Sequence, residues 1–291
     1  MISILIPCHD FNAYPLVCNL EKQALMLKIN FEIICIDDGS FSSKNEINQK
    51  INLLTNSRFI ESKKNIGRIN NRLLLAEKSQ YQWLLFIDVD TYPNSEDFLK
   101  NYIDQINLGL MSFGGSIYEE PKKNGFNLRY KFGKKREEVD SVIRNKNPYK
   151  YVSSRNFIGK KDLIVKVFSK IKNVSYGNDY IFGSILKKKK VDIIHIDNPV
   201  IIENIDENSI FIQKTHQALD NIIDCYRKDE IEKHSISILK AYIVLDFLFM
   251  KGVFVRLSNL FIKKIQKNLF SNNPNLFLFD LYRLNYICQI N

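Results

Sequence analysis

In the first half of the chain, short apolar runs alternate with segments whose apolar residues recur at helical spacing. The apolar runs cover residues 2–6, 31–36 and 83–87, and a short strand is expected over 58–61. The helical segments cover 14–28 and 44–55, and a third helix is expected from the loop at 65–68 to about residue 78. Short continuous apolar runs are typical of strands that are buried on both faces of a parallel sheet. The pattern therefore predicts an α/β fold with a doubly wound sheet flanked by helices.

The same alternation continues, less regularly, to about residue 205. We expect a helix over 95–106 that is capped by Ser95, a strand over 110–117, an extended segment over 151–159 and a helix over 161–171. A further helix should end near Lys190, before strands over 191–196 and 199–202. After Asp206 only helical spacing remains. We therefore predict an α/β domain over 1–205 and a helical extension over 206–291.

Composition and charge narrow the class of protein. The net charge of +10 favours anionic partners, but no nucleic-acid-binding motif is present, so nucleic acid is not expected. The five cysteines are scattered and form no C-x-x-C pair, which favours a reducing cytoplasm over a disulfide framework or a zinc site. The N-terminus has strand character and no basic segment, so we expect no signal peptide, and no 18-residue apolar run predicts a spanning helix.

The apolar run 83–87 leads directly into Asp88-Val89-Asp90. In an extended segment, side chains two residues apart lie on the same side, so both carboxylates face one space. The carboxyl edge of an open α/β sheet is where ligands bind, and a divalent cation with phosphate oxygens would suit two such anions. The alternative is an ordinary polar turn, because Asp, Thr, Pro and Asn all favour turns.

Other strand ends carry polar motifs that should meet at the same edge: Pro7 to Asp10, Asp37-Asp38 and Asn65 to Arg68. With Leu85-Phe-Ile-Asp-Val-Asp90, this ordered set resembles the inverting glycosyltransferases of family 2. The resemblance covers residues 2 to about 205. It implies the GT-A fold, a Rossmann-like mixed sheet, with a nucleotide-diphosphate sugar as donor.

The resemblance implies roles for the donor-site residues. Asp38 or Asp37 would bind the nucleotide base, and Pro7 to Asp10 would line the nucleotide pocket, with His9 where the family usually has an aromatic residue. Asn65, Gly67 and Arg68 would contribute to the donor site, with Arg68 meeting the diphosphate. Asp90 would ligate Mn²⁺ or Mg²⁺, while Asp88 would hold the ribose or assist the metal.

The resemblance also implies residues for the transfer step. Asp179 would be the base that removes the acceptor proton, although Asn178 stands where the family often has Glu. Asn156 would lie near the acceptor. His195 is a possible further metal ligand or a structural histidine. Where the family often has a ligand histidine, this chain has Ile202 and Glu203, so the third metal ligand is open.

Three other enzyme classes fit the motifs poorly. A haloacid dehalogenase phosphatase would need its Thr one position later than Thr91. A Rossmann dehydrogenase or a sugar nucleotidyltransferase would need a Gly-rich loop after the first strand, where Pro7-Cys8-His9-Asp10 stands. The remaining alternative is a degenerate GT-A-like domain that binds nucleotide or glycan without turnover.

Two segments are rich in basic residues. The segment 121–136 is expected to be a solvated or mobile loop, with contact to an anionic acceptor as the alternative. The tail after Asp206 alternates basic and apolar residues, which predicts either helical packing or peripheral contact with a membrane. With the family resemblance, the sequence predicts a metal-dependent transferase that modifies a glycan or lipid-linked acceptor. The resemblance implies that this acceptor belongs to cell-surface polysaccharide synthesis. The transferase would act in the cytoplasm, or there at the inner face of the membrane.

Overall fold

The computed structural model describes residues 1–106, 108–171, 176–202, 204–232 and 236–290. A seven-stranded sheet in the order β3-β2-β1-β4-β8-β6-β9 forms its centre. The strands are β1 (Ile2–Cys8), β2 (Phe31–Asp37), β3 (Ser57–Glu61), β4 (Trp83–Ile87), β6 (Met111–Phe113), β8 (Asn156–Lys160) and β9 (Ile193–His195). Strands β1 to β4 are parallel and β8 runs antiparallel to both of its neighbours, so the sheet is mixed. The predicted fold class is confirmed.

Alternate residues of the central strands enter two separate cores. In β4, Leu84 and Phe86 belong to one apolar cluster, while Leu85 and Ile87 belong to the cluster on the opposite face. All four side chains are fully buried. A strand with apolar partners on both faces has no polar alternation, which explains why these runs are continuously hydrophobic in the sequence.

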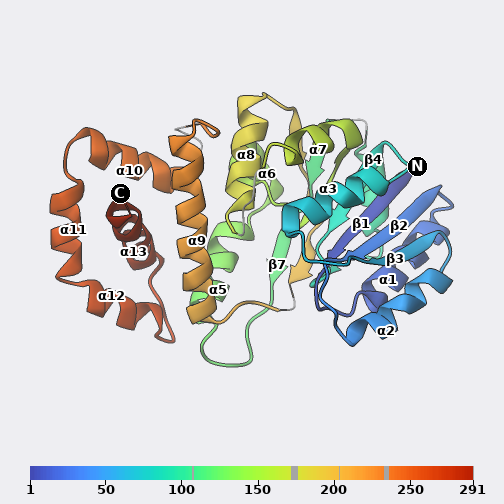
Figure 1. Cartoon of the computed structure of the whole chain (residues 1–291), viewed down its shortest axis with the longest axis horizontal. Helices are drawn as coiled ribbons and strands as arrows, with labels where there is room; N and C mark the ends of the chain where they lie inside the picture. The colour runs from blue at the N-terminus through green and yellow to red at the C-terminus, as the bar shows by residue number, and fades with distance from the viewer. Residues whose placement is uncertain (107, 172–175, 203, 233–235, 291) are drawn as a thin grey trace.

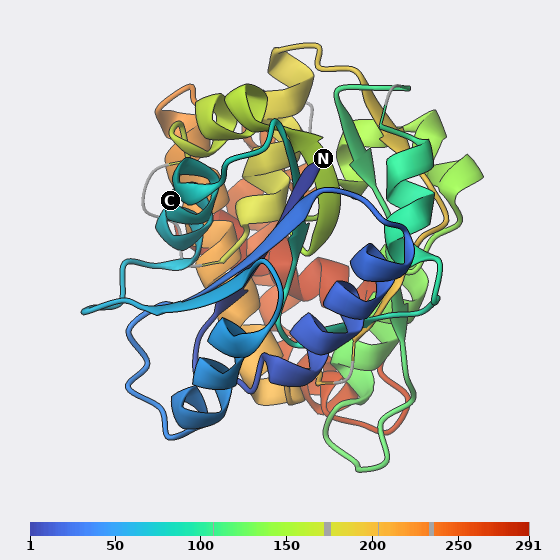
Figure 2. The same cartoon turned by 90° about the vertical axis from the view of Figure 1, so that its right-hand side faces the viewer.

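Helices cover both faces of the sheet. Helix α1 (Tyr14–Met26), the short α2 (Lys44–Asn48) with the following 3₁₀ turn η1 (Gln49–Leu53), and α4 (Phe98–Asp104) lie on one side. Helices α3 (Arg68–Lys78), α7 (Lys161–Phe168) and α8 (Asn178–Lys188) lie on the other. Figure 2 shows the blue α1 and α2 separated from the teal α3 by the strands. This arrangement leaves the carboxyl edge of the parallel strands free of covering helices.

A smaller sheet, in the order β5-β10-β7, lies beside the main one and consists of β5 (Thr91–Pro93), β10 (Val200–Ile202) and β7 (Ser116–Tyr118). The single strand expected over 110–117 is wrong, because the chain leaves one sheet and enters the other at Gly114-Gly115. Gly115 has a φ of +90°, and a Cβ on Gly114 would lie 2.2 Å from the Asn198 carbonyl oxygen. Glycine is thus required where the chain changes sheets.

The basic segment is not a solvated loop throughout. It contains α5 (Asn127–Phe132) and a π turn η2 (Gly133–Glu137), followed by α6 (Ser141–Lys146) and the 3₁₀ turn η3 (Pro148–Tyr151). Leu128 is fully buried and Arg129 is 8% exposed. The expectation fails for the second half of the segment because Phe126, Leu128, Tyr130 and Phe132 stand among the basic residues and give this part apolar side chains that can pack.

The C-terminal helices are α9 (Asn208–Arg227), α10 (Ser237–Phe247), α11 (Lys251–Asn259), α12 (Ile262–Leu269) and α13 (Leu276–Gln289). Figure 1 shows α10, α11 and α12 around α13, with α9 between them and the sheet. Leu219, Leu239 and Ile287 share an apolar cluster with the sheet residues, so the extension packs on the α/β core. The boundary at 205/206 stays a prediction. Among the described helices, none combines the length and the hydropathy needed to span a bilayer.

Candidate functional site

The loops that follow β1 and β2 leave the main sheet side by side. The two strands are parallel, with Cys8 opposite Asp37. The backbone N–H of Asp38 donates to the carbonyl of Cys8 at 2.8 Å. Pro7–Asp10 and Asp37-Asp38 therefore meet at the carboxyl edge, as the order of strands requires.

Asp37 and Asp38 both hold neighbouring loops in place. Asp37 accepts hydrogen bonds from the Ser40 hydroxyl at 2.6 Å and from the Ser40 N–H at 2.9 Å. Asp38 accepts from the N–H groups of Ile66 at 2.8 Å and Gly67 at 2.9 Å. Asp38 thus fixes the loop that leads into α3. The contact of Asp37 or Asp38 with a nucleotide base stays a prediction.

His9 and Asp10 are exposed beside these carboxylates. His9 Nδ1 lies 3.3 Å from the Asp38 carbonyl oxygen. The Asp10 carboxylate accepts from the Ser42 hydroxyl at 2.6 Å and pairs with Lys44 at 3.1 Å. The Ser42 hydrogen bond and the Lys44 cation hold the pKa of Asp10 below its ordinary value. The His9 ring therefore has an exposed position from which it could stack on a planar ligand.

The predicted carboxylates at the end of β4 have different surroundings. Asp88 accepts a hydrogen bond from the buried Arg72 guanidinium, and its N–H donates to the Arg155 carbonyl at 2.9 Å. Burial and the charge of Asp88 raise the pKa of Asp90, while the cations of Arg155 and Arg68 oppose the shift. The surroundings of Asp90 therefore disfavour its ionised form, which a further cation would stabilise.

Arg68 lies at the start of α3, behind the loop that Asn65 and Gly67 form. Asn65 Oδ1 accepts from the Gly67 N–H at 3.0 Å, and Gly67 has a φ of +88°. The Arg68 guanidinium lies 5.3 Å from the centroid of the Tyr176 ring, and Lys214 Nζ lies 4.9 Å from the same centroid. Two cations from distant segments thus share one aromatic side chain near Asp90.

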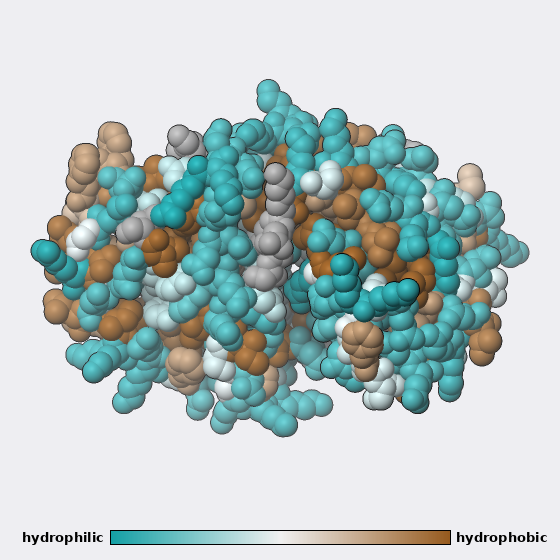
Figure 3. All heavy atoms as spheres, in the orientation of Figure 1, coloured by the Kyte–Doolittle hydropathy of each residue, from teal (hydrophilic) through white to brown (hydrophobic). Residues whose placement is uncertain are grey.

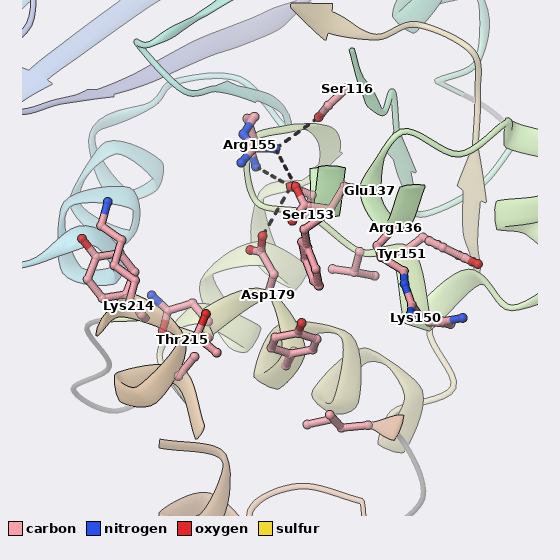
Figure 4. Close-up of a pocket in the computed structure, with 18 of the residues that line it drawn as sticks. Ser116, Arg136, Glu137, Lys150, Tyr151, Ser153, Arg155, Asp179, Lys214 and Thr215 are labelled. Atoms are coloured by element: carbon pink, nitrogen blue, oxygen red, sulfur yellow. Dashed lines mark hydrogen bonds and ion pairs between the residues drawn. The ribbon is translucent and has the colours of Figure 1, made fainter. Parts of the chain in front are cut away.

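Asp179 lies in the first turn of α8. Its carboxylate accepts from the Ser154 N–H at 3.0 Å and from the Ser153 hydroxyl at 3.4 Å. Gly177, at the N-cap, has a φ of +87°, and this turn aims the start of the helix at the cavity. Figure 4 shows Asp179 and Ser153 linked in this way, with Arg155 and Glu137 close by. The serine donors fix the orientation of the Asp179 carboxylate at the start of α8.

The charge of Arg155 acts on the predicted carboxylates at both ends of the cluster, Asp88 and Asp90 after β4 and Asp179 in α8. Its guanidinium donates to Ser116 Oγ at 3.3 Å and lies 3.9 Å from Glu137 (Figure 4). Burial opposes the charge on Arg155, but the nearby anions raise its pKa above the ordinary value, Glu137 most strongly, with Asp88 and Asp179 among the others. A fixed cation therefore lies between the end of β4 and the start of α8.

Glu137, like Arg155, belongs to this cluster of charged side chains, and the sequence suggested neither of them as a site residue. It accepts hydrogen bonds from the Tyr118 hydroxyl and, at 3.0 Å, from Arg129. Burial raises the pKa of Glu137 to about 7, the Arg155 cation opposes the shift, and the Asp179 anion adds to it. Burial also lowers the pKa of Arg129 to about 9. The site thus contains a carboxyl group that titrates near neutral pH.

A cavity of about 1110 Å³ joins most of these groups. It extends from the end of β4 past the start of α8 to α9, α10 and α13, and Figure 4 shows Lys214 and Thr215 facing Asp179 across it. Of the residues predicted from the sequence, the lining includes Arg68, Asp88, Asp90, Asn156 and Asp179. The predicted residues outside this lining, at the adjoining sheet edge, are Pro7, His9, Asp10, Asp37, Asp38, Asn65 and Gly67.

Asn156, the predicted acceptor residue, is engaged by the protein itself. Its Oδ1 accepts from the Tyr102 hydroxyl at 2.6 Å, and its Nδ2 donates to the carbonyls of Gly115 and Asn198, both at 2.9 Å. The side chain is 2% exposed. These bonds tie β8 to the point where the chain changes sheets. Contact with an acceptor stays a prediction and would have to compete with them.

His195 has no nitrogen free for a metal. Its Nε2 lies 2.8 Å from the Pro148 carbonyl, to which it donates, and its Nδ1 accepts from Arg144 at 3.0 Å. Burial lowers the pKa of His195 to about 4. Of its two predicted roles, the geometry fits the structural one. Ile202 ends β10 with an apolar side chain, and Glu203 lies outside the described residues.

The side chains at the end of β4 provide two carboxylates, which are some of the ligands that a hard cation needs. Across the described ranges, no three His, Cys, Asp or Glu side chains are grouped to hold a metal ion. Mg²⁺ is commonly bound by one or two carboxylates together with substrate phosphates, so a third protein ligand is not essential. Asp90, with its raised pKa, and Asp88 are the side chains that would hold such an ion.

Comparisons with known proteins show which family the chain matches and which solved structures have a similar fold. The sequence matches the model of glycosyl transferase family 2 over residues 3–169, more than half of the 291 residues. No curated protein matches it. The structure resembles S. aureus TarS 1–349 in complex with UDP-GlcNAc, with a TM-score of 0.51 and 16% identity over 76% of this chain and 66% of that one. It also resembles S. aureus TarS, with a TM-score of 0.50 and 16% identity over 86% of this chain and 43% of that one.

At this level of identity, the likeness to TarS concerns the fold alone. The chain spans just under two thirds of the first of these structures and less than half of the second. The match to the family model is independent of them, and it covers β1 to α7 with the carboxylates at the end of β4. The chain belongs to glycosyltransferase family 2.

Proposed function

We propose that this protein is an inverting, metal-dependent glycosyltransferase. It moves a sugar from a nucleotide-diphosphate sugar to a hydroxyl of a glycan or lipid-linked acceptor during assembly of cell-surface polysaccharide. It works in the cytoplasm. One observation carries the proposal: Arg68, Asp90 and Asp179, which lie far apart in the sequence, line a single cavity of about 1110 Å³.

The donor end of the cavity is the side nearest β4. Arg68 and Lys214 would supply cations for a diphosphate. Asp90 and Asp88 would hold Mn²⁺ or Mg²⁺. The ion would act there as a Lewis acid on the diphosphate. UDP is the nucleotide we infer, because the similar fold of S. aureus TarS 1–349 was determined with UDP-GlcNAc. His9 and Asp38 would border the uracil.

Asp179 is the proposed base. It is the carboxylate at the start of α8, and the donors from Ser153 and Ser154 keep it oriented toward the cavity. As the acceptor oxygen bonds to the anomeric carbon, its proton would pass to Asp179, while the nucleotide diphosphate departs from the opposite face of the sugar. Arg155 balances the charge of this group of carboxylates and keeps them together when the site is ionised.

A degenerate binding domain is the second candidate, because Asn178 replaces the usual Glu and His9 the usual aromatic residue. It predicts donor binding without transfer. The two candidates differ in the behaviour of Asp179, since only an enzyme requires a base.

The test compares Asp90→Asn and Asp179→Asn with wild type. UDP-GlcNAc binding is measured by calorimetry with Mn²⁺, and sugar transfer is measured with labelled donor and a bacterial glycan and lipid fraction. We expect Asp90→Asn to lose donor binding. Asp179→Asn should bind donor as wild type does and lose transfer by about 10²-fold or more. Donor binding without transfer by wild type would favour the degenerate domain, and absence of binding would refute both candidates.

A further inference from the structure

Exposed apolar side chains lie at the end of α10, in the turn to α11, on α11 and just after it, and we call this set the apolar cap. Figure 3 shows brown and tan side chains gathered at the left edge, where Figure 1 places α10 and α11. The exposed fractions range from 45% for Met250 to 94% for Phe249. The apolar cap consists of Phe247, Leu248, Phe249, Met250, Val253, Leu257, Leu260 and Phe261.

Helix α11 is apolar on two faces. Phe254 and Val255 pack against the core, and Ser258 accepts a hydrogen bond from Asn285 Nδ2 of α13 at 2.6 Å. The opposite face presents Val253 and Leu257, which are exposed to solvent. A surface helix normally places polar residues on its outer face. The outer face of α11 therefore has the character of a contact surface.

The turn between α10 and α11 is ordered by backbone hydrogen bonds. The Phe249 N–H donates to the backbone carbonyl of Asp246 at 3.0 Å, and the Met250 N–H donates to that of Leu245 at 2.9 Å. Phe249 adopts a φ of +57°, a conformation that is uncommon for a bulky residue. The fold thus holds Phe249, the most exposed large apolar residue among those that the structure describes, in a defined turn.

The charge around the apolar cap is mostly positive, and the nearest acid in sequence, Asp246, is paired with Lys251 at 2.7 Å. Residues 247–270 contain five Lys or Arg residues and no Asp or Glu. Arg256, Lys263, Lys264 and Lys267 of this set are exposed. Apolar side chains next to exposed cations are the combination that binds the interface of an anionic bilayer. A second copy of the chain fits less well, because a twofold contact would set these cations against themselves.

We propose that the apolar cap and the adjacent cations dock this protein on the surface of an anionic phospholipid bilayer. Phe247 and Phe249 enter the interface, while Arg256, Lys263 and Lys264 contact the lipid phosphates. The cavity of the proposed active site reaches α10, because Ile238 and Ala241 contribute to its lining. The inference extends the proposed function by placing the site beside a lipid-linked acceptor, but its test does not depend on sugar transfer.

The experiment is co-sedimentation of the full chain with vesicles of phosphatidylcholine alone and with about 30% phosphatidylglycerol added. We expect binding to the anionic vesicles, and at least tenfold weaker binding at about 1 M than at about 0.15 M salt. Phe247→Ser/Phe249→Ser and Lys263→Glu/Lys264→Glu should each weaken binding at least tenfold. Leu53→Ser is the matched control, because Leu53 is 86% exposed on the α/β domain, and it should bind as wild type does.

Thermal unfolding checks that each variant is folded, and light scattering gives the oligomeric state without vesicles. Absence of binding by wild type, or wild-type binding by both double variants, would overturn the proposal. A wild-type dimer that Phe247→Ser/Phe249→Ser converts to a monomer, without any vesicle binding, would instead assign the apolar cap to a second copy. Because UDP binding is measured separately, failure here leaves the proposed transfer reaction standing.

Discussion

Replacing Arg72 by Met tests whether a buried guanidinium holds Asp88 at the end of β4. The Arg72 side chain is 5% exposed and that of Asp88 is 23% exposed. Removing one partner of a buried ion pair typically costs about 3–5 kcal/mol. Asp88 keeps some contact with solvent, and Arg72 Nε has no hydrogen-bond partner among the described residues, so part of this cost is relieved. We expect a loss of about 3 kcal/mol, or roughly 6 °C in Tm.

The assay is urea unfolding of Arg72→Met, Asp88→Asn and the double variant, whose coupling energy should be about 1–2 kcal/mol. Arg58→Met is the control, because Arg58 is 46% exposed and its partner Glu32, although only 8% exposed, keeps hydrogen bonds from the Ser3 hydroxyl and the Gln80 N–H, both at 2.6 Å. Its loss should stay within about 1 kcal/mol. If Arg72→Met cost no more than Arg58→Met, or if the coupling were zero, Arg72 would not be what positions Asp88. UDP binding should weaken in Arg72→Met and not in Arg58→Met.

Three further predictions follow from single contacts. His195 has a pKa of about 4, below its ordinary 6.5, so wild type should gain up to about 3 kcal/mol over His195→Gln as pH rises from 4 to 6.5, measured by thermal unfolding. Glu137 has a pKa of about 7, above its ordinary 4.5, so wild type should lose about 1–2 kcal/mol relative to Glu137→Gln as pH rises through this range. Gly39→Ala would place a Cβ 2.4 Å from the Lys64 carbonyl carbon, so it should lower both stability and UDP affinity. Gly252→Ala is the control and should lower neither, because no atom lies within 4 Å of the added Cβ.

The strands that carry the site were predictable because burial on both faces leaves a plain signal. The run 83–87 coincides with β4, and the expected strand over 31–36 is extended by one residue, to Asp37. Ser95 was expected to cap a helix, but α4 begins at Phe98 after Asp97, and Ser95 Oγ instead accepts from the Asp97 N–H. Local hydrogen bonds of serine serve turns and caps equally, so the sequence did not distinguish them.

Arg155 and Glu137 could not be found from sequence patterns, because Arg155 is a single charge between polar and apolar residues and Glu137 is one of five consecutive charged residues, 134–138. Their importance arises from long-range packing, which brings Ser116 and Asp179 to the same guanidinium. Arg72 did leave a signal. It falls three residues after Ile69 and three before Leu75, on the buried face of α3, and a cation on an apolar face requires a partner.

The central claim is that the carboxylates at the end of β4 form a metal-assisted nucleotide-diphosphate site. The most direct measurement is thermal unfolding of wild type and Asp90→Asn with UDP, GDP, CDP and TDP, each with and without Mn²⁺. At about 100 times its dissociation constant a ligand adds about 2.7 kcal/mol, a shift of several degrees. We predict that UDP stabilises wild type when Mn²⁺ is present, and that Asp90→Asn shows no such shift. Equal shifts in the two proteins, or no shift with any nucleotide, would contradict the claim.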